Sequence, residues 1–249
     1  MSLWADVDGN SQIGLISGTL MRLIESQQHI ATLSFVDTLE EQALLEDLLE
    51  GAKPEYNNNY DKYHYLLKTP FRYPPLKWGS RFGQVFEPSI FYAGLSISAV
   101  LAESAFYRFV FWHSMEESSS DGFIRTQHTL FSATYSSMNG VKLHQTPFAE
   151  HEKVLTDPSN YSLTQELGAQ MRKADINAFE YVSARDKQKG KCVGLFSPNA
   201  FRQKKPSDMS QWLCELSSSK VTFKQYGNKQ LHTFALDEFL IDGRLPYPA

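Results

Sequence analysis

A single carboxylate, Glu103, interrupts an otherwise apolar and aromatic helical run over residues 97–112. At helical spacing it shares a stripe with Val100, Tyr107 and Val110, and we expect this stripe to face inward. Burial of an unpaired carboxylate is costly, so the position predicts a cationic or hydrogen-bonding partner, or a cavity that the carboxylate lines.

Cationic side chains stand among aromatic residues just before this helix. Arg72, Lys77 and Arg81 are the candidate partners of Glu103, and residues 89–95 read as a short buried strand that leads into the helix. A strand, nearby cations and a lone acid together indicate a site.

Size and charge exclude several classes of protein. At 249 residues and 28.4 kDa the chain is long enough for one large domain, or for a domain with a helical appendage. A net charge of -4 offers no electrostatic footprint for nucleic acid or for an anionic membrane. We therefore expect no direct binding to nucleic acid or to a membrane surface. No run approaches the roughly 20 apolar residues of a membrane span, so we expect a cytoplasmic protein.

The pattern of metal-binding residue types gives no support to a metal site. Cys192 and Cys214 lack metal-ligand spacing and stand in apolar, strand-like contexts, so we expect two buried free thiols. The seven histidines are scattered and form no clustered motif, so we expect no catalytic metal.

The N-terminal quarter predicts helices. Apolar residues recur at helical spacing over residues 11–32. Thr38 with Glu41 reads as a capping box for a second helix, which has an apolar leucine face and ends near Gly51 and Pro54. With the polar connector that follows, residues 1–65 form a predicted N-terminal helical extension.

The remainder predicts a mixed core. Ser96 or Ser98 could cap the helix that carries Glu103, and Asn139-Gly140 predicts a hairpin between strands over residues 126–136 and 141–144. A helix is expected over residues 160–174. The later predicted strands are 178–184, 191–197, 211–217, 221–226 and 230–236. Without regular βαβ alternation, the fold class is α+β.

Five short elements resemble the RES domain family, which is named for its Arg, Glu and Ser. They are Arg72-Tyr73, Gly79-Ser80-Arg81-Phe82-Gly83, Tyr92-Ala93-Gly94, Glu103 and Ser183. The resemblance extends to the N-terminal region, which is similar to the leader of longer members. Residues 66–249 are the predicted RES domain.

The resemblance implies an ADP-ribosyltransferase-like mixed β core and an enzyme that splits the nicotinamide-ribose bond of NAD+ by hydrolysis or phosphorolysis. NAD+ would be a substrate, and no cofactor is expected. Relatives resemble toxins held in check by a helix-turn-helix antitoxin. Transfer of ADP-ribose to a macromolecule and a non-catalytic NAD-binding module remain alternatives, and a homo-oligomer stays open.

The resemblance also implies roles for single residues. A carboxylate stabilises the positive charge that develops on ribose when an N-glycosidic bond breaks. A guanidinium forms bidentate hydrogen bonds to the oxygens of the pyrophosphate. An aromatic face suits the nicotinamide ring, with a hydroxyl nearby. The predicted catalytic residues are Glu103, Arg72 and Ser183, and the predicted substrate-binding residues are Tyr73, Arg81 and Tyr92, with Arg72 and Arg81 on the pyrophosphate.

Each of these residues also has a structural interpretation. Glu103 could form a partly buried ion pair with Arg72 or Arg81. The two tyrosines could be core residues, and Ser183 could end a strand, since no nucleophile elbow surrounds it. The neighbouring Arg185-Asp186 could be a surface ion pair or could reach the site, and both residues stay unassigned.

Overall fold

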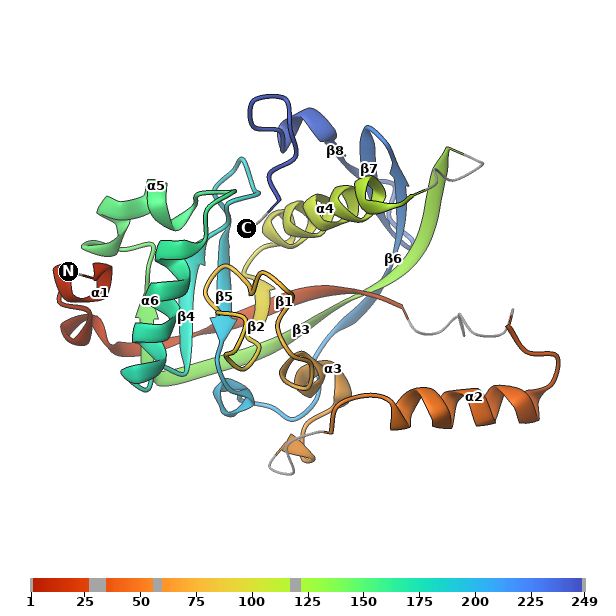
Figure 1. The fold of residues 1–249 in the computed structure, drawn as a ribbon, viewed down its shortest axis with the longest axis horizontal. Coiled ribbons are helices and arrows are strands. Elements are labelled where there is room, and N and C mark those ends of the chain that lie inside the picture. Colours follow the sequence, from red (N-terminus) through yellow and green to blue (C-terminus); the bar gives the residue numbers. More distant parts are fainter. Residues whose placement is uncertain (1, 27–34, 56–59, 117–121, 248–249) are drawn as a thin grey trace.

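The longest element of the computed structural model is β3, Phe123–Lys142, a strand of 20 residues that crosses the whole molecule (Figure 1). The structure describes residues 2–26, 35–55, 60–116 and 122–247. Along β3 run β1 (Gly14–Glu25) and β6 (Met209–Ser217), both antiparallel, while β4 (Ala178–Val182) joins its end in parallel. This one strand therefore links every part of the eight-stranded sheet.

Five of the strands close on themselves. β2 (Phe91–Gly94) pairs with β1 and with β5 (Lys191–Leu195), β5 pairs with β4, and β3 pairs with both β4 and β1. β7 (Lys220–Gln225) and β8 (Leu231–Ala235) extend the sheet beyond β6. The result is a closed ring of five strands with an antiparallel extension of β6, β7 and β8, which we call the wing. The fold class is α+β, as predicted.

The helix predicted over residues 11–32 is wrong for the part that the structure describes. Residues 14–25 are β1, which pairs with β3 from Gly14 opposite Gly140 to Glu25 opposite His128; residues 27–34 lie outside the described residues. Its apolar residues fit a helical period, but Gly18 and its β-branched neighbours suit a strand better. A Cβ at Gly18 would lie 3.0 Å from the Tyr135 hydroxyl, so the glycine permits this close pairing.

The predicted hairpin at Asn139-Gly140 is also wrong, because the chain runs straight through it as part of β3. Gly140 pairs with Gly14 on one side and with Ala178 on the other. A Cβ at Gly140 would lie 2.3 Å from the side chain of Ile16. The glycine therefore serves close strand packing and not a turn.

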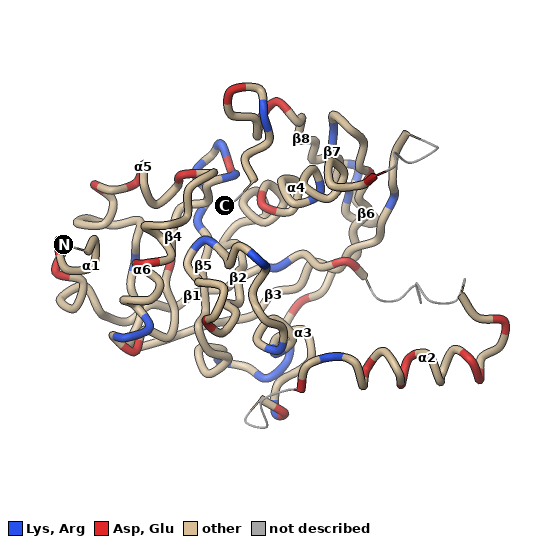
Figure 2. Tube along the Cα trace, viewed as in Figure 1, with Lys and Arg blue, Asp and Glu red and all other residues tan. Residues whose placement is uncertain are grey.

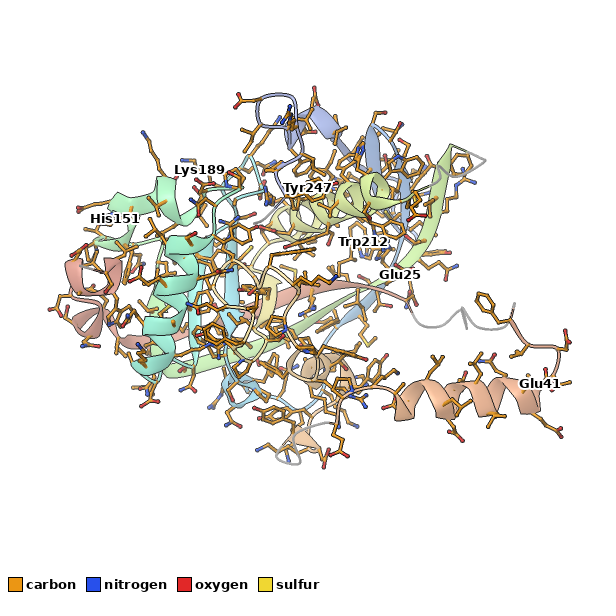
Figure 3. The ribbon with its side chains drawn as sticks, in the orientation of Figure 1. Glu25, Glu41, His151, Lys189, Trp212 and Tyr247 are labelled. Atoms are coloured by element: carbon orange, nitrogen blue, oxygen red, sulfur yellow. The ribbon has the colours of Figure 1, made fainter. Side chains whose placement is uncertain are left out.

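Two helices agree with the sequence. α4, Ile97–Ser114, begins at Ser96, whose hydroxyl accepts a hydrogen bond from the Ala99 N–H. Its buried side chains form one cluster with buried residues of β6 and β7, Trp212 among them (Figure 3). α6, Ser162–Lys173, approaches the chain so closely at Gly168 that a Cβ there would meet the Phe82 carbonyl at 1.8 Å. α6 contacts α1 (Leu3–Asp6) and α5 (Glu152–Leu155).

A third predicted helix, α2 (Leu39–Gly51), lies apart from the sheet (Figure 1) and carries acidic residues along its length (Figure 2). Thr38 caps it by accepting from the Glu41 N–H, while the Glu41 carboxylate accepts from the Asp37 N–H, one residue earlier than a capping box requires. Leu44 and Leu48 are 60% and 63% exposed. In the described part of residues 1–65 the chain thus forms the short helix α1, one strand of the sheet and the exposed helix α2, in place of the predicted pair of helices.

The remaining short helix, α3 (Tyr65–Lys68), precedes the segment that leads into β2. Among the described residues, no helix is long and apolar enough to cross a membrane. Cys192 and Cys214 are both buried free thiols, as the sequence predicts.

Buried and exposed positions of β1 should differ in their effect on the free energy of unfolding. Leu20 is fully buried and Leu15 is 57% exposed. Leu20→Ala should lower the free energy of unfolding by about 2–5 kcal/mol because it leaves a cavity, whereas Leu15→Ala should change it by less than about 0.5 kcal/mol. Urea unfolding of both variants measures the difference. Equal losses would contradict the placement of β1.

Candidate functional site

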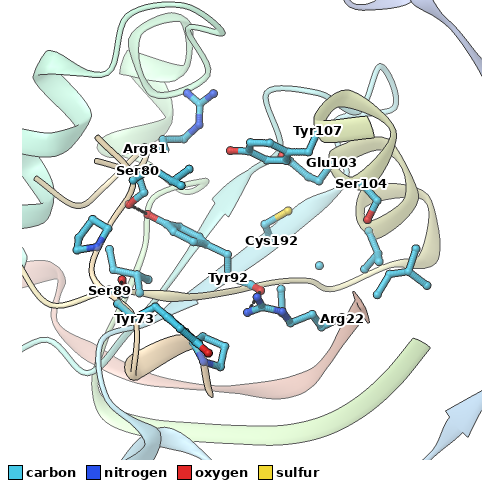
Figure 4. Close-up of a pocket in the computed structure, with 18 of the residues that line it drawn as sticks. Arg22, Tyr73, Ser80, Arg81, Ser89, Tyr92, Glu103, Ser104, Tyr107 and Cys192 are labelled. Carbon is cyan, nitrogen blue, oxygen red and sulfur yellow. Dashed lines mark hydrogen bonds between the residues drawn. The ribbon is translucent and has the colours of Figure 1, made fainter. Parts of the chain in front are cut away.

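A cleft of about 1010 Å³ opens between α4, the edge of β1 and β2, and residues 69–81 (Figure 4). Part of β3 forms its far wall. Its lining includes Arg22, Glu25, Tyr73, Arg81, Tyr92, Glu103, Tyr107, Arg108, Phe111, Thr126 and His128. Four of the six predicted site residues therefore line the same cleft, which is large enough for a dinucleotide.

Glu103 lies on α4 in this cleft, half-buried, and its Oε1 accepts a hydrogen bond of 2.6 Å from the Ser183 hydroxyl. The Ser183 oxygen in turn accepts from the backbone N–H groups of Arg185 and Asp186, each at 3.1 Å. Because these two donors occupy the oxygen lone pairs, the hydroxyl proton points at Glu103. Ser183, which follows β4, thus fixes the carboxylate.

The structural interpretation of Glu103 as an ion pair finds no support. Among the described residues, no ion pair joins Glu103 to Arg72 or to Arg81. A carboxylate held by a neutral hydroxyl keeps its full negative charge available to whatever enters the cleft.

Tyr92 presents its ring to the cleft and uses its hydroxyl elsewhere. The hydroxyl lies 2.9 Å from the Ser80 Oγ and accepts from the Phe82 N–H at 3.0 Å. Burial raises the pKa of Tyr92 to about 12, so the phenol stays protonated. Tyr73 also lines the cleft and is 39% exposed. Both tyrosines are at the cleft, with aromatic surface toward its interior.

Arg81 lines the cleft, but its guanidinium is engaged behind it. It donates to the carbonyl oxygens of Leu155 and Asp157 at 3.3 and 2.7 Å, and it stacks 4.5 Å from the centre of the Tyr161 ring. These contacts join the loop of Arg81 to the segment before α6. The geometry gives Arg81 the task of anchoring that loop.

Arg72 is not among the residues that line the cleft. Its guanidinium forms an ion pair of 2.7 Å with Glu50 at the end of α2 and donates to the Pro54 carbonyl. Arg72 follows a short 3-10 turn, Thr69–Phe71, and the next residue, Tyr73, does line the cleft. The phosphate-binding role predicted for Arg72 therefore finds no support in this geometry.

Arg22 is a cleft residue that the sequence did not reveal. It lies on β1, donates to the Tyr92 carbonyl at 3.2 Å, and stacks 4.8 Å from the centre of the Phe91 ring. Burial lowers its pKa to about 10, which still leaves it protonated at neutral pH. The available signal was strand alternation, which places Arg22 on one face with Ile16 and Leu20.

A second polar group occupies the far end of the cleft. Arg108 of α4 donates to the Glu25 carboxylate at 2.6 Å and lies 3.0 Å from the His128 Nε2, which is also 2.8 Å from the Thr126 hydroxyl. Because a guanidinium only donates, Nε2 is the unprotonated nitrogen of His128. Burial, and then the charge of Arg108, lower the pKa of His128 to about 4.

Arg185 and Asp186 are both buried, so they are not a surface ion pair. Arg185 stacks 3.5 Å from the centre of the Phe106 ring and donates to the Pro158 carbonyl at 2.7 Å. Asp186 accepts from the Ser98 hydroxyl at 3.0 Å, near the start of α4. Both residues brace the turn whose N–H groups hold Ser183.

The family model of the RES domain matches residues 59–217, which is more than half of the chain and contains all six predicted site residues. The chain belongs to the RES domain family. No curated protein matches it in a sequence comparison. The RES domain is associated with NAD+-related toxins and indicates, in general, an enzyme that acts on NAD+. Within the described parts of the chain, no three His, Cys, Asp or Glu side chains gather as a metal site would require.

His128 predicts a pH dependence of the stability of this RES domain. The unfolded chain, with a histidine pKa of about 6.5, binds more protons than the folded one between pH 6.5 and about 4. The contribution of His128, about 3 kcal/mol, is therefore complete above pH 6.5 and is lost as the pH falls toward 4.

Urea unfolding at a series of pH values tests this. The free energy of unfolding of His128→Gln should fall less steeply over that window than that of the wild type. His113→Gln, at an exposed position of α4, is the matched control and should keep the wild-type slope. Equal slopes for His128→Gln and the wild type would contradict the assignment.

Proposed function

We propose that the protein cleaves the bond between nicotinamide and ribose in NAD+, within the cleft beside α4. The observation that carries the proposal is Glu103, held by Ser183 at 2.6 Å in a cleft of about 1010 Å³. Membership of the RES domain family supports NAD+ as the substrate. NAD+ is consumed in this reaction and is not a cofactor.

In the proposed step the bond between C1' and the pyridinium nitrogen breaks, and its electron pair neutralises the nitrogen of the leaving nicotinamide. Positive charge passes to the ribose, where the Glu103 carboxylate stabilises it. An oxygen of water or phosphate then bonds to C1' and gives up its proton. The products are nicotinamide and either ADP-ribose or its 1''-phosphate.

The other residues of the site bind and position. Ser183 acts through Glu103, because its hydroxyl fixes the direction of the carboxylate. The rings of Tyr92 and Tyr73 offer flat apolar surface for nicotinamide. Arg22, a half-buried arginine of the cleft, takes the role on the pyrophosphate that the family resemblance assigned to Arg72 and Arg81.

The biological setting belongs to the same proposal. The association of the RES domain with NAD+-related toxins supports a toxin that depletes NAD+. The helix-turn-helix antitoxin that the resemblance implies would be its partner. Transfer of ADP-ribose to a macromolecule uses the same bond cleavage with a different acceptor. Intact-protein mass spectrometry separates the two reactions, since transfer adds the mass of ADP-ribose to a target.

Glu103→Gln should lower the rate of nicotinamide release on the order of 100-fold or more, because the amide cannot stabilise the developing charge. The measurement is chromatography of nicotinamide from NAD+, with and without phosphate. Glu150→Gln changes an exposed carboxylate outside the cleft and should keep the wild-type rate. Circular dichroism of both variants verifies folding. Unchanged release from a folded Glu103→Gln variant would rule out the proposed role.

Substitutions of Arg22 and Arg72 should have different effects on kcat/KM for NAD+. Arg22→Lys keeps the charge but loses the planar fork, and it should lower kcat/KM for NAD+ roughly 10-fold, the size of a lost charge-assisted hydrogen bond. Arg72→Lys, outside the cleft, should stay within about 2-fold of the wild type. A larger loss in the Arg72 variant than in the Arg22 variant would restore the original prediction.

A further inference from the structure

The cleft continues well beyond Glu103. On the same side of α4 it is lined by Tyr107, Arg108 and Phe111. Phe111 is eight residues after Glu103, which at 1.5 Å per residue is a distance of about 12 Å along the helix. The far lobe is the part of the cleft between Arg108, Phe111, Glu25 and His128. A ligand cleaved at Glu103 and held at Arg22 has space there for the rest of its length.

The chemistry of the far lobe suits a nucleoside. Phe111 is 47% exposed and offers an aromatic face, and Leu23 and Ile124 add apolar surface. The polar group opposite them is the Glu25 carboxylate, at the last position of β1, where Figure 3 labels it beneath α4. Apolar walls with one placed acceptor are typical of a site for a base and its ribose.

Glu25 is the accessible member of its ion pair. Its side chain is 57% exposed, whereas that of Arg108 is 16% exposed. The two N–H bonds of one Arg108 nitrogen point at Glu25 and at His128, with distances of 2.6 and 3.0 Å. Arg108 therefore holds the carboxylate in place, His128 accepts from Arg108, and the Thr126 hydroxyl contacts His128. The pair is neutral as a whole, and the member that is accessible from the cleft is the carboxylate.

We propose that the far lobe binds the adenosine ribose of NAD+ and that Glu25, held by Arg108, selects NAD+ against NADP+. The inference rests on the proposed function for the position of the dinucleotide. A carboxylate accepts hydrogen bonds from a ribose 2'-hydroxyl, as acidic residues do in other dinucleotide sites. NADP+ carries at that position a phosphate with nearly two negative charges, which a fixed carboxylate repels.

The same arrangement predicts which substitution reduces the preference for NAD+ over NADP+. Glu25→Gln keeps an acceptor for Arg108 and for the ribose hydroxyl but removes the negative charge. The charge of Arg108 is then no longer neutralised by its neighbour, and a guanidinium is a good partner for phosphate. Loss of the carboxylate charge should therefore leave the lobe with the uncompensated positive charge of Arg108, which attracts the 2'-phosphate.

The first test measures kcat/KM for nicotinamide release from NAD+ and from NADP+. The ratio of the two values should fall about 10-fold or more in Glu25→Gln relative to the wild type, since a like-charge contact is exchanged for an opposite-charge one. Glu150→Gln, an exposed carboxylate outside the cleft, should leave the ratio unchanged. A wild-type ratio in the Glu25 variant would overturn the inference.

A second test needs no turnover. Calorimetry compares 5'-AMP with adenosine 2',5'-bisphosphate as ligands of the wild type and of Glu25→Gln. The variant should shift preference toward the bisphosphate about 10-fold, and adding Arg108→Gln should cancel that gain. The same preference in both proteins, or no binding of either nucleotide, would overturn the inference. Absent nicotinamide release by the wild type would instead contradict the proposed function, and the binding comparison would still decide the role of Glu25.

Discussion

The hydrogen bond from Ser183 to Glu103 is the contact on which the rest of the site depends. Two backbone N–H groups fix the serine oxygen, so its proton has one direction left, toward the carboxylate. The bond joins the end of β4 to the second turn of α4, two elements that are 80 residues apart in the chain. It holds a negative charge at the mouth of a cleft without neutralising it, which an ion pair would do.

The closed ring of strands supplies the opposite side of that cleft. Because β1 pairs with both β2 and β3, Arg22 comes to lie beside Tyr92 and below Glu103 (Figure 4). A cation and an anion thus face one space from two elements without contacting each other. NAD+ has the complementary arrangement, with a negative pyrophosphate and a positive nicotinamide ring. Charge complementarity of this kind sets the orientation of a ligand more than its affinity.

Local signals explain what the sequence predicted well. The cap at Ser96, the periodicity of α6 and the alternation of the strands from β4 to β8 are each encoded within a few residues, and all appear in the structure. Glu103 was recognisable because a lone acid in an apolar helix is unusual. Tyr92 and Ser183 were recognisable only through the family motif, since nothing local distinguishes them from core or turn residues.

Pairing across the chain explains what the sequence did not predict. Gly140 has the signature of a turn, but its glycine is needed because Ile16, more than 120 residues away, packs against it. Residues 14–25 fit a helical period, and only β3 makes them a strand. That error concealed Arg22. Arg72 stands in the motif next to Tyr73, but Glu50 of α2 draws its side chain away from the cleft.

A crystal structure of the Glu103→Gln variant with NAD+ tests the account most directly, because the bound dinucleotide would persist for observation. We predict that C1' of the nicotinamide ribose lies within about 3.5 Å of the side chain at position 103, the separation of a near-attack arrangement. The pyrophosphate should lie against Arg22. NAD+ bound with its C1' far from position 103, or outside the cleft, would contradict the central claim.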